Sequence, residues 1–277
     1  MTDPFVTADW LASNLDTVVV LDATYYLPSD PARSRADWEA ARIPGARLFE
    51  IDTVADPESD LPHMLPTEAG FAVAMAALGI DGTKPVVVYD RSTNHFSAPR
   101  VWYTLRLFGL EKVFVLDGGM TSWTGGGHAT EQGAARPYET VPQRTWKLRR
   151  SQVISGPDMA VRVATGGEVI IDARSQDRFD GTAPEPRPGL KSGHMPGATC
   201  LPFGTLTGPD GLFLGRAELK ALFGNRAACD PILSCGSGMT ACVLALGLAR
   251  IGVTGRLFDG SWAEWGQGTL GPIETVG

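Results

Sequence analysis

A short glycine-rich segment in the C-terminal half contains the residue best suited to covalent chemistry, in the order Cys235-Gly236-Ser237-Gly238-Met239-Thr240. The apolar run 231–234 before it predicts a buried strand, and the pattern of 241–251 after it predicts a helix. Two glycines let successive N–H groups point inward, and a helix N-terminus adds partial positive charge. Because such a nest stabilises a thiolate, the motif predicts that Cys235 is a nucleophile.

A buried structural thiol is the alternative for Cys235, since free cysteines usually pack inside proteins. Open α/β sheets bind ligands at the carboxyl ends of their strands, where this loop is expected, and that position favours the reactive interpretation. The remaining cysteines form no Cys-x-x-Cys pair, so they predict neither a zinc site nor a disulfide framework. We expect core packing for all three: Cys200, Cys229 and Cys242.

Phosphate binding is another possible use of such a loop. Cysteine phosphatases close a Cys-x5 segment with an arginine that clamps the phosphoryl oxygens. That position is Ala241 here, and without a guanidinium the charge that develops during phosphoryl transfer is poorly stabilised. A persulfide carries a single negative charge and needs only the N–H groups, so the loop favours sulfur chemistry over phosphate chemistry.

Two arginines follow another predicted strand, which ends at Asp172. Arg178 and Arg187 bracket a segment whose Pro and Gly content predicts a loop, and loops at a sheet edge often carry sites. The planar fork of arginine suits the carboxylate and ketone oxygens of a 2-oxo acid better than the lysine ammonium does. The alternative for each arginine is a solvated surface charge.

These motifs need elements that position them, and the chain supplies such elements twice. Four landmarks recur in the same order in the two halves: 18–23 and 169–174, 42–46 and 194–198, 85–89 and 231–235, and 117–123 and 259–265. Helical patterns alternate with the strands, at 71–78, 101–108, 217–223 and 239–251. This order predicts an α/β fold of two tandem domains, each a mostly parallel sheet flanked by helices.

We place the first domain at 1–130 and the second at 144–277. The linker between them, 131–143, lies in a stretch rich in Gly, Ala, Thr and Pro without apolar periodicity. Segment 90–100 of the first domain matches the cysteine loop in position but contains no cysteine. Only the second domain is therefore expected to be catalytic.

Charge and hydropathy restrict the partners. The net charge is −7 and no long basic run is present, which argues against nucleic-acid binding. No segment approaches the length needed to cross a bilayer, and the first residues lack a basic stretch followed by an apolar core. We expect a cytoplasmic protein with no membrane partner.

The two units resemble tandem rhodanese domains, and the cysteine loop resembles that of the 3-mercaptopyruvate sulfurtransferases, with Met239 where the family typically has valine. Thiosulfate-preferring relatives usually carry basic residues in this loop, and this loop has none. The resemblance implies an enzyme that moves sulfur from 3-mercaptopyruvate to a Cys235 persulfide and releases pyruvate. The sulfur then passes to a thiol, such as thioredoxin or glutathione, or to cyanide. The alternatives are a thiosulfate:cyanide sulfurtransferase and a non-catalytic binding or regulatory module.

The resemblance also implies roles for individual residues, and it implies no cofactor and no metal. Substrate binding involves two arginines and four loop residues: Arg178, Arg187, Gly236, Gly238, Met239 and Thr240. Proton transfer involves Ser237 with Asp52 and His63, which match the family's residues that reach the loop across the domain interface. A histidine with a carboxylate partner can move protons near neutral pH, and the alternative is that His63 only caps a loop. Other residues are expected to support the fold: Asp172, His194, Trp262 and Trp265.

Overall fold

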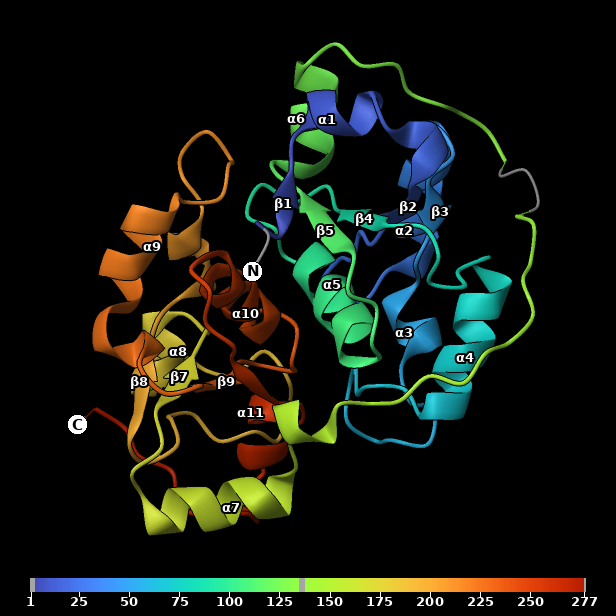
Figure 1. The fold of residues 1–277 in the computed structure, drawn as a ribbon. Coiled ribbons are helices and arrows are strands. Elements are labelled where there is room, and N and C mark those ends of the chain that lie inside the picture. Colours follow the sequence, from blue (N-terminus) through green and yellow to red (C-terminus); the bar gives the residue numbers. More distant parts are fainter. Residues whose placement is uncertain (1–2, 135–137, 277) are drawn as a thin grey trace.

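The computed structural model describes residues 3–134 and 138–276, which form two five-stranded sheets (Figure 1). The strand order is β1-β5-β4-β2-β3 in the first sheet and β6-β10-β9-β7-β8 in the second, and the pairings within both sheets are parallel. Parallel neighbours need crossover connections, which helices provide here. The prediction of two tandem α/β units is confirmed.

The elements follow one another in the same order in both units, except that the first unit has one more α-helix between its third and fourth strands. The first unit contains β1 (Phe5–Val6), α1 (Ala8–Ala12), β2 (Val19–Asp22), α2 (Pro31–Ala40), β3 (Arg47–Leu48), α3 (Ile51–Val54), α4 (Glu68–Ala77), β4 (Val86–Tyr89), α5 (Ala98–Leu107), β5 (Val113–Leu116) and α6 (Gly119–Gly125). The second contains β6 (Val153–Ile154), α7 (Gly156–Thr165), β7 (Ile170–Asp172), α8 (Gln176–Asp180), β8 (Ala198–Cys200), α9 (Arg216–Phe223), β9 (Ile232–Ser234), α10 (Ala241–Arg250), β10 (Arg256–Phe258) and α11 (Ser261–Trp265). The four predicted helices correspond to α4, α5, α9 and α10, each starting within three residues of the expected position.

The apolar runs occupy the centre of each sheet. Every residue of β2 and β4 is buried, and so is every residue of β7 and β9. Strands that are covered on both faces are apolar throughout rather than alternating. Helices α5 and α10 pack against each other between the two units, and one buried apolar cluster includes residues of both units. This shared core fixes the first unit opposite the cysteine loop.

One local prediction needs correction. The segment that begins at Arg178 is predicted to be a loop, but α8 continues through Asp180. Ser175 has an extended backbone before this helix, and Gly181 ends it with a left-handed φ of 81°. Arg178 therefore lies on a short helix and only Arg187 lies on the loop.

The predicted linker 131–143 begins with residues that contact the first unit. Glu131 and Arg42 exchange backbone hydrogen bonds of 2.8 and 2.9 Å, and the Arg42 side chain donates to the Glu131 carboxylate at 2.6 Å. Residues 135–137 of this linker lie outside the described residues. Across the described part of the chain, the helices are all too short or too polar to span a membrane.

The strand register shows which residue of the first unit is equivalent to Cys235. Tyr89, the last residue of β4, lies beside Asp22, which ends β2. In the second unit Ser234, the last residue of β9, lies beside Asp172, which ends β7. The next residue is Asp90 in the first unit and Cys235 in the second, and each carbonyl accepts a backbone hydrogen bond of 2.9 Å. Aligning 85–89 with 231–235 places Tyr89 opposite Cys235 and is wrong by one residue, because matching two apolar runs does not determine their register.

Candidate active site

Cys235 lies at the carboxyl edge of the second sheet, where its loop joins β9 to α10. The residue is 1% exposed, so bulk water has little access to the sulfur. The N–H groups of Cys235 and Gly238 both donate to Ser261 Oγ, at 3.2 and 3.1 Å. This shared acceptor holds the loop in a tight curve.

Other N–H groups of the loop have no acceptor among the described residues: those of Gly236, Ser237, Met239 and Thr240. Buried N–H groups in folded proteins are nearly always paired. Several unpaired N–H groups that follow one thiol directly in the chain can therefore donate hydrogen bonds to a negatively charged group.

Ser261 supports the loop, although it is not among the predicted site residues. Its φ of 49° is left-handed, which is uncommon for a residue with a side chain, and its hydroxyl donates to the Phe258 carbonyl at 2.8 Å. Gly119 has a similar φ of 53° at the matching position of the first unit. The alignment of 117–123 with 259–265 contained the signal, since a serine replaces a glycine at a position that favours glycine.

Both predicted substrate arginines lie beside the loop. A Cβ atom added to Gly236 would lie 3.3 Å from Arg178 Nη2 and 3.9 Å from Arg187 Nη1. Arg187 Nη2 also donates to Ser237 Oγ at 3.3 Å. Two guanidinium groups this close to one loop can bind a carboxylate together with a neighbouring carbonyl oxygen.

Asp52, His63 and Ser237 converge from the two units around Arg187. His63 Nδ1 lies 2.7 Å from Asp52 Oδ1, and His63 Nε2 lies 3.4 Å from Arg187 Nη2. Because a guanidinium only donates, Nε2 accepts and Nδ1 carries the proton that is donated to Asp52. Arg187 contacts both His63 and Ser237, and within residues 3–134 and 138–276 no hydrogen bond joins those two directly.

Asp52 is held by hydroxyl groups as well as by His63. Ser29 donates to Asp52 Oδ2 at 2.7 Å, and the Tyr25 hydroxyl donates to the same oxygen at 3.2 Å. The hydrogen bond from His63 is the largest cause that lowers the pKa of Asp52 from its ordinary value. Asp52 is therefore ionised at neutral pH and keeps His63 in one tautomer.

A buried ion pair connects the two units next to the loop. Arg100 Nη1, from α5, donates to Asp259 Oδ1 at 2.8 Å and to the Gly238 carbonyl at 3.2 Å, and Arg100 Nη2 donates to the His63 carbonyl. Asp259 Oδ2 accepts from the Leu65 N–H at 2.8 Å. The pair thus fixes the cysteine loop and the turn at His63, whose φ of 62° is left-handed. The sequence alone does not reveal this pair, because the partners are 159 residues apart.

The equivalent loop of the first unit contains its own negative group. The Asp90 carboxylate accepts from the backbone and hydroxyl of Ser92 at 2.9 and 2.7 Å. It also accepts from the N–H groups of Ser97 and Ala98 at 2.8 and 2.7 Å. These donors are then unavailable to a reacting anion, which supports the prediction of a single active site.

The other cysteines differ in their surroundings. Cys242 is fully buried, as predicted, and burial raises the pKa of its thiol to about 12. Cys200 is half-buried, and burial is also the main cause that raises its pKa to about 12. Cys229 is exposed, so the prediction of core packing is wrong for this residue, which lies in a bend before β9 rather than on a helix or strand.

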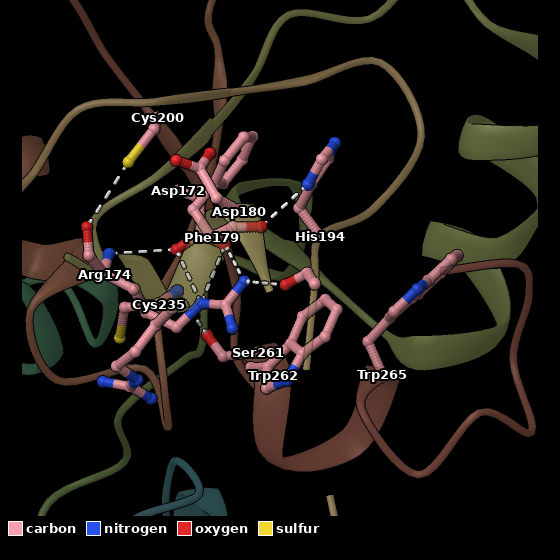
Figure 2. Close-up of polar contacts among 12 residues, drawn as sticks. Asp172, Arg174, Phe179, Asp180, His194, Cys200, Cys235, Ser261, Trp262 and Trp265 are labelled. Carbon is pink, nitrogen blue, oxygen red and sulfur yellow. Dashed lines mark hydrogen bonds and ion pairs between the residues drawn. The ribbon is translucent and has the colours of Figure 1, made fainter. Parts of the chain in front are cut away.

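Of the residues expected to support the fold, Trp262 contacts the cysteine loop through a hydrogen bond of 2.9 Å to the Cys235 carbonyl, whereas His194 and Trp265 lie farther from Cys235 (Figure 2). Arg174 Nη2 is 2.7 Å from Asp172 Oδ2, and its guanidinium lies over the ring of Trp262 at 4.0 Å. His194 stacks on Phe179 with 4.0 Å between the ring centroids. These contacts hold α8 and α11 against the sheet edge that carries Cys235.

The duplicated parallel sheet corresponds to a known family. The model of the rhodanese-like domain matches this chain at residues 7–125 and again at 157–267, so the chain belongs to the rhodanese-like domain family. Within it, the chain is 40% identical to the 3-mercaptopyruvate sulfurtransferase of Escherichia coli (strain K12), over 98% of each protein. It is also 40% identical to thiosulfate/3-mercaptopyruvate sulfurtransferase 1, mitochondrial, of Arabidopsis thaliana, over 99% of this chain and 79% of that protein.

Solved structures show the same similarity. A crystal structure from Escherichia coli, described as showing the rhodanese fold and catalytic mechanism of 3-mercaptopyruvate sulfotransferases, matches with a TM-score of 0.80 and 36% identity. The match covers 95% of this chain and 100% of that one. The fold and its duplication are therefore those of this family over nearly the whole chain.

Proposed function

We propose that this protein is a 3-mercaptopyruvate sulfurtransferase that carries sulfur as a persulfide on Cys235. The observation that carries the proposal is the position of Arg178 and Arg187 over Gly236, the residue after the thiol. A 2-oxo acid offers a carboxylate and a ketone oxygen that two guanidinium groups can bind. Relatives of this name, 40% identical over nearly the whole chain, support the assignment.

In the first step, the Cys235 thiolate attacks the sulfur of 3-mercaptopyruvate. A sulfur–sulfur bond forms, the carbon–sulfur bond breaks, and its electron pair stays on carbon as the enolate of pyruvate. Arg178 and Arg187 stabilise the charge on the enolate oxygens. The unpaired N–H groups of the loop hold the negative outer sulfur of the persulfide.

The proton of the donor thiol must then reach the enolate carbon. His63 accepts at Nε2 and Ser237 has a hydroxyl beside Arg187, so both are suited to transfer this proton. Arg187 lies between them, and we propose that donor binding draws the Arg187 guanidinium onto the substrate carboxylate. His63 and Ser237 are then free to exchange the proton.

In the second step, an acceptor thiol attacks the outer sulfur, takes it as its own persulfide, and leaves the Cys235 thiolate. Thioredoxin and glutathione are the thiol acceptors that we propose, and cyanide is a further acceptor, whose carbon attacks the same sulfur and leaves with it as thiocyanate. Splitting one transfer into two displacements on the same sulfur is typical of covalent catalysis and predicts ping-pong kinetics.

We also propose a cytoplasmic location. The four cysteines are free, which suits a reducing compartment. Because one relative is named as mitochondrial, fractionation of cells that express the full chain is the appropriate test, and recovery with the mitochondrial fraction would contradict this part of the proposal.

Thiosulfate is the second candidate donor, since the Arabidopsis relative is named for both donors. The experiment that separates the donors compares the kcat/KM of sulfur transfer from 3-mercaptopyruvate with that from thiosulfate, with cyanide as acceptor. We expect the larger value with 3-mercaptopyruvate. A larger value with thiosulfate would overturn the donor assignment, and no transfer from either would favour a binding or regulatory module.

A further inference from the structure

Four charged side chains form a chain of ion pairs that ends beside the cysteine loop. Arg174 contacts Asp172 at 2.7 Å and donates through Nη1 to Glu185 Oε1, also at 2.7 Å. Glu185 Oε2 accepts from Arg178 Nη2 at 2.5 Å, and Glu185 Oε1 accepts from Arg178 Nε at 3.3 Å. Figure 2 shows the first of these contacts, between Arg174 and Asp172, with the Trp262 ring beside the Arg174 guanidinium.

Glu185 is the buried member of this chain that meets a substrate arginine. Its side chain is 2% exposed, whereas that of Arg178 is 24% exposed. Two guanidinium groups, those of Arg174 and Arg178, hold its carboxylate at 2.7 and 2.5 Å. Its two contacts use one side of the Arg178 fork, Nε and Nη2, and within the described ranges Nη1 makes no hydrogen bond and is available to a ligand.

The charges of these four side chains sum to zero, and the positive charge of Arg187 is additional to them. Asp172 and Glu185 together balance Arg174 and Arg178. Arg187, by contrast, contacts neutral partners in the part of the chain that the structure describes, His63 and Ser237, and has no carboxylate within ion-pair distance there. The surface that faces the donor therefore presents two guanidinium forks, and of these only that of Arg178 is paired directly with a carboxylate among the described residues.

We propose that Glu185 makes the site selective for the charge of the sulfur donor, so that the site accepts a monoanion and disfavours a dianion. This inference rests on the proposed function and names the residue that selects between its two candidate donors. The 3-mercaptopyruvate carboxylate carries one negative charge and is balanced by Arg187. Thiosulfate carries two, and its second charge is repelled by the fixed carboxylate behind Arg178.

The test replaces the charge but keeps the shape. In Glu185→Gln the amide oxygen still accepts from arginine while one negative charge is removed. We expect the ratio of kcat/KM for thiosulfate to kcat/KM for 3-mercaptopyruvate to rise about tenfold, which is the order of effect of one charge near the edge of a pocket. Glu185→Asp keeps the charge but shortens the side chain, so its activity should fall while the ratio stays as in the wild type.

A matched control removes an acid from the same segment. Asp180 on α8 accepts a hydrogen bond from Gln176 at 2.8 Å and pairs with no arginine in the described structure. Asp180→Asn should leave the ratio unchanged. If Glu185→Gln lowers the activity on both donors by the same factor, then Glu185 only positions Arg178 and the inference is wrong.

Binding of unreactive anions provides a readout that needs no turnover. We expect the inhibition constant of sulfate to decrease relative to that of pyruvate in Glu185→Gln, and an unchanged ratio would overturn the inference. If this variant does not fold, Arg187→Gln tests the same charge balance in the opposite direction, and its thiosulfate ratio should fall. If the wild type transfers sulfur from neither donor, it is the proposed function that has failed, whereas a wild type active on 3-mercaptopyruvate with an unchanged ratio in Glu185→Gln contradicts the inference alone.

Discussion

Replacing Arg100 by methionine should destabilise the protein strongly. The side chains of Arg100 and Asp259 are 3% and 5% exposed and are joined at 2.8 Å. Removal of one partner leaves the other charge buried without compensation, which costs about 3–5 kcal/mol. At roughly 2–4 °C per kcal/mol, the midpoint of thermal unfolding should fall by about 10 °C.

The assay is the free energy of unfolding in urea, measured for Arg100→Met, Asp259→Leu and the double variant. The double variant should be more stable than the sum of the two single losses predicts, because it leaves no unpaired buried charge. Lys147→Met is the matched control, since Lys147 pairs with Glu68 at 3.1 Å but is 77% exposed, and it should cost less than about 1 kcal/mol.

The same variants test whether this pair positions the site. Arg100 touches the carbonyl groups of Gly238 and His63 rather than the donor, so kcat should fall more than KM rises in Arg100→Met. A loss of stability below about 1 kcal/mol, or strict additivity in the double variant, would refute the reasoning about burial. Unchanged kcat in the folded fraction would refute the positioning role.

Three further predictions concern the loop and its neighbours. Gly236→Ala places a Cβ 3.3 Å from Arg178 Nη2, so the KM for 3-mercaptopyruvate should rise severalfold while circular dichroism is unchanged, and an unchanged KM would contradict the close approach. Asp52→Asn should lower kcat roughly tenfold or more, because His63 loses the carboxylate that fixes its tautomer. The pKa of Asp52 is lowered on folding, so its contribution to stability is present above pH 3.8, the ordinary value, and is lost as the pH falls through the pKa of the folded state. The free energies of unfolding of wild type and Asp52→Asn in urea should therefore converge at acid pH. The pKa of Cys242 is raised from 9.0 to about 12, so its stabilising contribution is present below pH 9 and is lost as the pH rises towards 12. Wild type should therefore lose more stability than Cys242→Ala over that range, and equal losses would contradict the burial effect.

The fold could be predicted from the sequence because its signals are local and repeated. Apolar runs such as 85–88 and 231–234 end in polar or small-residue loops, and these become strands β4 and β9. What failed was the exact equivalence of neighbouring residues. Two apolar runs can be aligned in more than one register. Only the strand pairing shows that Asp90, and not Tyr89, is equivalent to Cys235.

The site was predictable where its residues follow one another in the chain. Cys235, its loop and the nearby arginines could be chosen from residue type and position. The partners that join distant segments could not, since nothing in the sequence connects Arg100 with Asp259 or shows that Glu185 is buried between two arginines. Ser261 lay in an aligned landmark, but its role depends on backbone angles that the alignment does not reveal.

The most direct test of the central claim is the mass of the peptide that contains Cys235 after the full chain is incubated with 3-mercaptopyruvate and digested. We predict a gain of one sulfur atom on this peptide, loss of that gain on addition of an acceptor thiol, and no gain in Cys235→Ser. A gain on the peptides of Cys200 or Cys229 instead, or full sulfur transfer by Cys235→Ser, would contradict the claim.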